Sequence, residues 1–439
     1  MFDPLNVQVH SEVDPLRAVM VHRPGAELLN MTQHQLEQLL FDDILSPPAA
    51  IREHDLMTEL FRGVGARVIE LTDVLVAALE VAHPDNKRRL LNAICEQRGV
   101  GEIVQPLLEF ESTDLAHSLI CGLQWKDVAG PLTLARLRSQ FLDPLTSALP
   151  PSPNLMFMRD PCISVRDRVV VGRMATQARI TESWLVAFAI QHSGLCGEGT
   201  LLFDDYDLQR NQSYRSLEGG DVLVLSPNVL MIGCSERTSA QTIERLAREH
   251  LFPAFTDLER VYVVLMPEQR TVMHLDTICT QIDRDLFLAY APQICPGPEA
   301  LPVAMLERNG GLVLTPEATV LDVLRDTLGR YTTVIPCGGA NPIQQKREQW
   351  TDGANALAVG PGKILLYARN ALTIQALADQ GFQETAIHWV QDPQERATLI
   401  AEGMARSRTV FSMPAGELSR ARGGGRCLTM PLVRTTSLT

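Results

Sequence analysis

The sequence lacks an uninterrupted apolar stretch of the roughly 18 residues that a membrane-spanning helix needs. Its opening segment, MFDPLNVQVHSEVDP, has neither a basic start nor an apolar centre and so does not have the pattern of a secretory signal. We therefore expect a cytoplasmic protein that does not associate with membranes.

Positive charge is in deficit, because 39 lysines and arginines stand against 52 aspartates and glutamates, a formal net charge of -13. Such an acidic surface repels nucleic acid backbones and anionic lipids, so nucleic acid is not an expected partner. A cationic or zwitterionic small molecule is compatible with it. The 45% of hydrophobic and 21% of charged residues are typical of a globular chain rather than a disordered one.

The nine cysteines are an odd number and include no C-x-x-C pair, which argues against a disulfide scaffold and a structural zinc site. Phosphate-binding loops are missing as well. The segment GVGARV at 63–68 lacks the dinucleotide spacing, and GGGR at 423–426 lacks the lysine and hydroxyl residue of a phosphate loop. We expect neither a metal nor a cofactor.

What the chain does contain is a repeated unit: an acidic or glycine-rich lead-in, an alternating strand, a tight turn, a second strand and often an amphipathic helix. Residues 10–24 and 426–434 would together supply a fifth unit that joins the two ends of the chain. Units arranged radially bury their apolar faces against one another and leave their lead-ins near a common axis, which predicts an α/β ring with a central pocket. The four continuous copies begin at Asp160, Gly219, Asp276 and Gly353.

From Leu75 to about Leu149 the apolar residues take helical spacing and hairpins are absent. This pattern predicts an inserted α-helical subdomain at 75–149, with the proline-rich segment 148–154 as the return to the ring. The remaining residues, 1–74 and 150–439, would form the α/β catalytic domain.

Period-two alternation in TVMHLDTICTQI, residues 271–282, predicts a strand with His274, Asp276 and Ile278 on one face. A base and a carboxylate would then point the same way. On its own, such a pair is more often a surface pair or a hydrogen-bonded interior histidine than a catalytic one.

Carboxylates recur at the lead-ins of three hairpins, as Asp160, Glu218 and Asp276. Glu218 taken alone is equally compatible with a turn carboxylate in solvent. If the lead-ins converge on an axis, several carboxylates share one pocket, and like charges then raise one another's pKa. Such a pocket calls for a cationic ligand.

Cys427 follows the glycines 423–425 and precedes a strand. This position is compatible with a thiol exposed at the rim of the pocket, and also with a strand cysteine packed in the core. Arg422 and Arg426 lie close in sequence, so they would favour the thiolate and are able to pair with a carboxylate.

These residues fall within an ordered series of motifs. The series runs HSEVDPLRAVMVHRPG (10–25), LLFDDI (39–44), NLMFMRD (154–160), LEGGD (217–221), CSERTSAQTIERL (234–246), MHLDT (273–277), REQWTDGANALAVGPG (347–362) and RGGGRCLTMPLVR (422–434). From about residue 7 to residue 434 the chain resembles the bacterial arginine deiminases. The related amidinotransferases and dimethylarginine hydrolases resemble it in the ring but lack the helical insertion. Met158 departs from the threonine usual in the family motif, and Leu428-Thr429 replace Met-Ser.

The resemblance implies a five-bladed α/β propeller that hydrolyses L-arginine to L-citrulline and ammonia without a cofactor or metal. It implies that Cys427 is the nucleophile and His274 the general acid and base. Asp160 and Asp276 would bind the guanidinium, and Glu218 would assist orientation and proton movement.

By the same resemblance, the α-amino and α-carboxylate end of the substrate would be held by Asn154, Arg179, Arg237 and Arg422. We expect Asp221 to join the substrate-binding residues. The family also suggests a homodimer or a higher homo-oligomer.

Two alternative functions stay open at this point. An amidinotransferase would use the same cysteine and pass the amidino group to an amine instead of water. A non-catalytic arginine-binding protein would keep the pocket without turnover.

Overall fold

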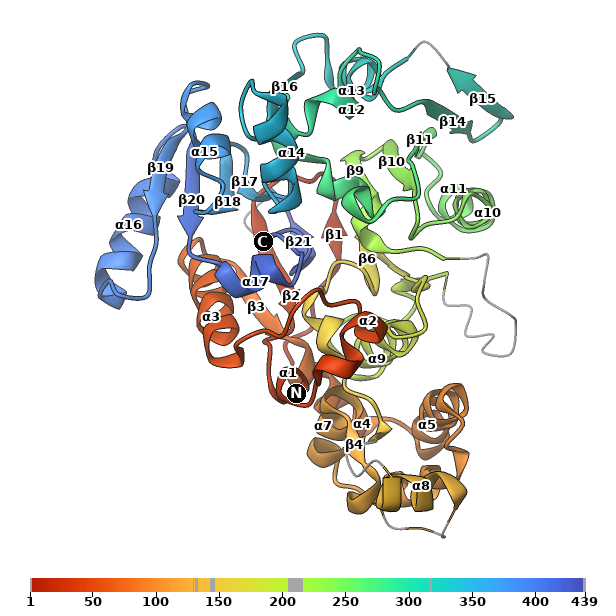
Figure 1. Cartoon of the computed structure of the whole chain (residues 1–439). Coiled ribbons are helices and arrows are strands. Elements are labelled where there is room, and N and C mark those ends of the chain that lie inside the picture. The colour runs from red at the N-terminus through yellow and green to blue at the C-terminus, as the bar shows by residue number, and fades with distance from the viewer. Residues whose placement is uncertain are drawn as a thin grey trace.

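The computed structural model describes residues 2–128, 130, 133–142, 147–203, 216–315 and 318–436. Over these ranges the chain has a mixed α/β fold in which helices surround several separate sheets (Figure 1). No helix within the described ranges has both the length and the apolar character needed to cross a membrane.

All four predicted hairpins are present and antiparallel. They are β6 (Cys162–Val165) with β7 (Arg168–Val171), β9 (Val222–Ser226) with β10 (Val229–Cys234), β12 (Cys279–Asp283) with β13 (Leu286–Ala289), and β17 (Leu357–Gly360) with β18 (Lys363–Tyr367). The second strand of each hairpin pairs in parallel with a strand that follows a helix: β8 (Leu201–Leu202), β11 (Arg260–Leu265), β16 (Thr333–Pro336) and β20 (Thr409–Met413). The repeated unit is therefore strand, strand, helix, strand.

The crossover from β7 to β8 is α9 (Ile180–His192), and that from β10 to β11 begins with α10 (Ala240–Arg245). The later crossovers contain α13 (Val320–Leu328), α15 (Ala371–Ala378) and α16 (Pro393–Ala405). Three further strands enlarge the sheets. β14 (Val303–Glu307) and β15 (Leu312–Thr315) extend the sheet of β9 to β11, and β19 (Gln383–Ala386) pairs with β20.

The two ends of the chain share one sheet, as predicted. Its strand order is β1 (Gln8–Val9), β21 (Met430–Arg434), β2 (Leu16–Val21) and β3 (Arg67–Glu70). β21 runs antiparallel to β2 and parallel to β1, and α3 (Pro47–Gly63) connects β2 with β3. In Figure 1 this sheet lies at the centre of the view, between the first and last repeats.

A group of helices forms a lobe at the bottom of Figure 1. Its helices are α4 (Leu71–Val81), α5 (Pro84–Arg98), α6 (Val104–Leu108), α7 (Ser112–Cys121) and α8 (Leu134–Leu142). α5 begins with a proline, whose missing N–H costs nothing there, and ends at Gly99, whose φ of 68° suits the left-handed cap.

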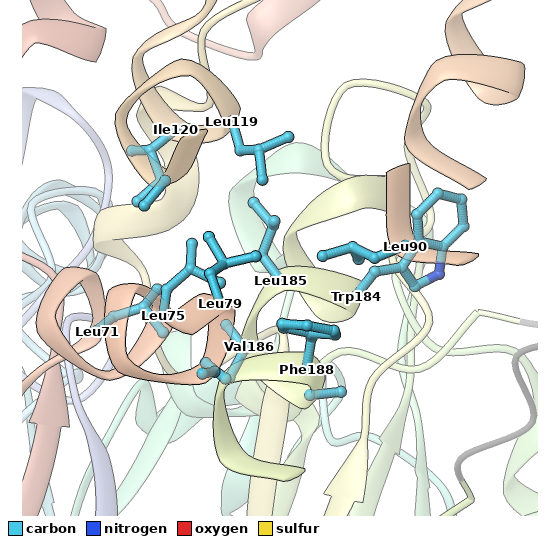
Figure 2. Close-up of a cluster of buried hydrophobic side chains, with 14 of the residues drawn as sticks. Leu71, Leu75, Leu79, Leu90, Leu119, Ile120, Trp184, Leu185, Val186 and Phe188 are labelled. Atoms are coloured by element: carbon cyan, nitrogen blue, oxygen red, sulfur yellow. The ribbon is translucent and has the colours of Figure 1, made fainter. Parts of the chain in front are cut away.

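Apolar side chains attach this lobe to the rest of the molecule. Leu75 and Leu79 of α4 and Leu119 of α7 face Leu185 and Phe188 of α9 in one buried cluster (Figure 2). Full burial of each such side chain contributes about 1.5–3 kcal/mol. α9 is therefore shared between the lobe and the sheet of β6 to β8.

The predicted strand through His274 and Asp276 is wrong. Leu275–Thr277 form a single 3₁₀ turn, and β12 begins only at Cys279. The backbone N–H of Leu275 donates to the carboxylate of Asp221 at 2.9 Å, which holds the turn from another repeat. The alternating pattern did not reveal the turn because its stabilising acceptor lies 54 residues away in the chain.

Candidate active site

Cys427 lies between the glycine loop and β21 with 5% of its surface exposed. Its N–H and that of Arg426 both donate to Oδ1 of Asn355, at 3.2 and 3.1 Å. A Cβ on Gly424 would lie 2.6 Å from the same oxygen, so the glycine permits the close approach. Of the two placements that the sequence left open, the structure has the buried one, because the bonds to Asn355 hold the loop in the interior.

Cys427 borders a cavity together with side chains from most of the chain. Asp276, Glu218 and Asp221 are fully buried and do not line it. Leu40, Phe157 and Met273 were not predicted but contribute apolar wall. The predicted residues that line the cavity are Asn154, Asp160, Arg179, Arg237, His274, Arg422 and Cys427.

His274 is 3% exposed and hydrogen-bonds through Nε2 to Glu218 at 2.9 Å. Its Nδ1 lies 3.9 Å from Asp160. Burial alone would lower the pKa of His274, but the charge of Asp160 and the hydrogen bond to Glu218 raise it to about 9. The imidazole is therefore protonated at neutral pH. A Cβ on Gly220 would lie 2.7 Å from this ring, so glycine is required there.

Glu218 balances that positive charge. Burial would raise its pKa, but Arg237 and the hydrogen bond from His274 lower the pKa to about 2. Arg179 and Arg237 lie 3.8 and 3.9 Å from its two oxygens. For Glu218, the expected mutual raising of carboxylate pKa values is thus outweighed by the arginines.

Arg179 fixes the position of Asp160. Its Nη1 donates to Asp160 at 2.8 Å, its Nε to Glu182 at 2.9 Å and its Nη2 to the carbonyl of Asn154 at 3.3 Å. Glu182 is fully buried and was not predicted. Its signal was its place one helical turn after Arg179 at the start of α9, where two side chains three residues apart meet.

Asp276 is held in place by a different arginine, Arg426. Its Oδ2 accepts a hydrogen bond from Arg426 at 2.8 Å and lies 3.8 Å from the sulfur of Cys427. Its Oδ1 is buried and has no hydrogen-bond partner in the described part of the chain. A buried carboxylate oxygen without a donor is costly, which marks it as a position for a ligand N–H.

The pKa of the Cys427 thiol is raised, whereas we expected the nearby arginines to favour the thiolate. Burial and the charges of Asp276, Asp160 and Asp352 raise its pKa well above the ordinary value. Arg426 does not lower the pKa of the thiol, because its guanidinium is already paired with Asp276 and Glu12. A cation placed among these carboxylates would lower the pKa again.

Two arginines leave donors available at the cavity. The guanidinium of Arg422 stacks 3.3 Å above the ring of Trp350, and its Nε and Nη1 have no hydrogen-bond partner among the described residues. The Nε of Arg237 has no hydrogen bond among these residues either, and it lies 3.7 Å from the carboxylate of Glu236. Such donors suit a carboxylate ligand.

Asp221 was predicted to bind substrate, but it is fully buried and does not line the cavity. Its carboxylate accepts hydrogen bonds from the hydroxyl of Ser235 at 2.7 Å and from the N–H of Leu275 at 2.9 Å. It thereby holds the turn that carries His274. Burial raises its pKa to about 7.

Within the described ranges, one group of side chains has its ligand atoms close enough together for a metal: Asp160, Glu218 and His274, within 4.8 Å of one another. The protonated imidazole has no lone pair to offer. Arg179 and Arg237 already supply positive charge to the carboxylates. The set fits an organic cation better than a metal ion.

Comparison with known proteins shows to which family the chain belongs. The family model described as arginine deiminase matches residues 37–434. The chain belongs to the arginine deiminase family. It is 32% identical to an arginine deiminase of Latilactobacillus sakei over 438 residues and 33% identical to one of Listeria monocytogenes over 440, with 98% of each chain covered in both cases. Among solved structures, an amidinotransferase of saxitoxin biosynthesis from Microseira wollei has a TM-score of 0.48 at 14% identity, covering 99% of this chain and 98% of that one.

The family confirms the resemblance inferred from the motifs. The residues at which the chain departs from the arginine deiminase motifs do not line the cavity. Met158 and Leu428 are both fully buried in hydrophobic clusters and do not line the cavity. The hydroxyl of Thr429 donates to the carbonyls of Gly425 and Arg426, both at 3.1 Å, and so stabilises the loop before the strand.

Proposed function

We propose that the chain is an arginine deiminase, which converts L-arginine and water into L-citrulline and ammonia without a cofactor. One observation carries the proposal: a buried thiol, a protonated histidine and unpaired arginine donors border the same cavity. The thiol lies 3.8 Å from a carboxylate whose other oxygen lacks a donor.

In this proposal Asp160 and Asp276 bind the planar guanidinium along its N–H edges. Arg422 and Arg237 bind the α-carboxylate with N–H groups that make no hydrogen bond to the described residues. Asn154 and Arg179 complete the site, Asn154 through its side chain at the cavity and Arg179 through its hold on Asp160. The central carbon then faces the sulfur of Cys427.

The bound guanidinium also activates the nucleophile. Its positive charge offsets the carboxylates that raise the pKa of Cys427, so the thiol loses its proton when substrate is present. The thiolate attacks the central carbon and forms a C–S bond. His274 donates its proton to one terminal nitrogen, the C–N bond breaks, and ammonia leaves.

The intermediate is an amidino-thioether on Cys427. Neutral His274 takes a proton from a water molecule, which attacks the same carbon. The C–S bond then breaks, the thiol is regenerated and citrulline leaves. The proton that the thiol releases when substrate binds leaves with ammonia as ammonium, so one arginine cation and one water give one citrulline and one ammonium, and atoms and charge balance.

The decisive experiment is mass spectrometry of the protein quenched during turnover with arginine. The peptide containing Cys427 should gain the mass of arginine less one ammonia, and citrulline and ammonia should form in equal amounts without any added amine. Product that forms only when an amine is added would instead indicate an amidinotransferase. Arginine binding without any product would indicate a binding protein.

We also propose the finer architecture. Five units of the same order, the last one shared by the two ends of the chain, support a five-bladed α/β propeller. Residues 75–149 would be its helical insertion and residues 1–74 and 150–439 its catalytic domain. Cytoplasmic location and a homo-oligomeric state stay predictions.

A further inference from the structure

Arg426, the residue before Cys427, has only 2% of its surface exposed and does not line the cavity. Its guanidinium nevertheless connects to the site. Nη1 donates to Asp276 at 2.8 Å, and Nε and Nη2 donate to the two oxygens of Glu12, each at 3.2 Å. Nη2 also donates to the carbonyl of Val222 at 2.7 Å. The planar fork of an arginine suits this bridge between two carboxylates.

Glu12 is the outer end of the bridge. It is 7% exposed, and its Oε1 accepts a further hydrogen bond from the N–H of Val224 in β9 at 3.0 Å. Burial would raise its pKa, but Arg426 and Arg159 lower the pKa to about 2, so Glu12 is ionised at neutral pH. Arg426 is therefore anchored to a strand of another repeat.

Asp276 is the inner end of the bridge. Arg426 donates a hydrogen bond to Oδ2 of Asp276. The other oxygen, Oδ1, is buried and lacks a donor among the described residues. The orientation of that free oxygen depends on the bond to Arg426, since the carboxylate turns as one plane.

We propose that Arg426 is a positioning residue that fixes Asp276 relative to the sulfur of Cys427, with Glu12 as its anchor. This inference rests on the proposed function. Arg426 and Cys427 are adjacent, and both N–H groups are bound by Asn355. The backbone that carries the attacking sulfur therefore also carries the side chain that orients the carboxylate. Misplacement of reacting groups by about 1 Å costs roughly 100-fold in rate.

The test compares Arg426→Lys with Arg434→Lys. Arg434 is a matched control, because it is 1% exposed and donates to the carbonyls of Asp14 and Ala358 rather than to Asp276. A lysine keeps the charge but is a single point donor and cannot bridge two carboxylates. With arginine as substrate, we expect kcat of Arg426→Lys to fall by at least about tenfold, and kcat of Arg434→Lys to stay within about twofold, at a temperature where both are folded.

A second variant, Glu12→Gln, reports on the anchor without altering Arg426 or Asp276. It should lower kcat less than Arg426→Lys does, and the double variant should be no slower than Arg426→Lys alone, because both changes act through one bridge. Thermal unfolding of each variant separates this effect from a merely structural role, which would lower the melting temperature and leave kcat unchanged.

Two results would overturn the inference: Arg426→Lys with the kcat of Arg434→Lys, or, if Arg426→Lys does not fold, a folded Glu12→Gln with unchanged kcat. Failure of the proposed function gives a different result. In that case the unmodified protein itself forms no citrulline from arginine.

Discussion

His274 donates through Nε2 to a carboxylate oxygen of Glu218 over 2.9 Å, and both side chains are buried. The pair comes from two repeats, 56 residues apart in the chain. Its effect is to keep a proton on the imidazole at neutral pH, with a pKa of about 9. A histidine that carries its proton before substrate arrives suits the general-acid role that we propose for it, in which ammonia leaves before water attacks.

Glu218→Gln should shift the alkaline limb of the pH profile. His274 is protonated below its pKa of about 9 and loses its proton as pH rises through that value. Loss of the Glu218 charge lowers this pKa, so the fall in kcat/KM should begin at a lower pH than in the unmodified protein. Citrulline formation measured across the pH range checks this. Glu244→Gln, at an exposed position of α10, is the control and should leave the limb in place.

His274→Ala should lower kcat by about 10²–10⁴, the usual range for loss of a general acid and base. Binding of arginine, measured by calorimetry, should persist because the carboxylates and arginines of the cavity remain. His117→Ala on an exposed face of α7 should change neither quantity. A His274→Ala protein that turns over at the unmodified rate would exclude the proposed proton transfers.

Asp276→Asn should make Cys427 more reactive and the enzyme less active at the same time. The charge of Asp276 is, after burial, the largest contribution that raises the pKa of the thiol. Its removal should speed alkylation of Cys427 by iodoacetamide at neutral pH, while kcat/KM falls by at least about tenfold because the guanidinium loses a partner.

The readout for Asp276→Asn is the alkylation rate of the peptide that contains Cys427. Asp283→Asn, at the end of the following strand, is the control and should react like the unmodified protein. Slower alkylation in Asp276→Asn would contradict the electrostatic account of the thiol.

Arg179→Lys should raise KM for arginine by at least about tenfold. A lysine cannot hold Asp160, Glu182 and the Asn154 carbonyl together, so Asp160 would lose its fixed orientation. Steady-state kinetics measure the change, with the surface variant Arg168→Lys as control. An unchanged KM would mean that Asp160 does not depend on Arg179.

Gly219→Ala should destabilise the fold. A Cβ there would lie 2.0 Å from the carbonyl oxygen of Arg159, so the backbone must shift, at a cost of about 1–3 kcal/mol in the free energy of unfolding. Gly197→Ala is the matched control, because a Cβ at Gly197 meets no atom within 4 Å. Urea unfolding should separate the two variants, and equal stabilities would contradict the close approach at Gly219.

Several features could be predicted because their signals are local. Alternating apolar residues around short turns predicted four hairpins, and each lies where the pattern indicated it. The helical spacing of apolar residues predicted helices, and the structure has them in α4 to α8. The motifs also singled out the side chains that meet at the cavity, although not how deeply they are buried.

The features that escaped prediction depend on partners distant in sequence. The turn at Leu275–Thr277 needs Asp221, and the burial of Cys427 needs Asn355. Glu12 gave no distinct signal, since a lone glutamate is ordinarily a solvated side chain.

By itself, then, the sequence determined the repeats, the family and the set of groups that we propose to bind and attack a guanidinium, because these follow from neighbouring residues and ordered motifs. Only the tertiary structure decided the charge states of those groups. Glu12 and Arg426 are 414 residues apart, yet their contact, with the bond from Arg426 to Asp276, joins the loop that carries Cys427 to a buried carboxylate. The physical reason is that pKa values and hydrogen bonds depend on distance and burial in space, which separation along a chain does not specify.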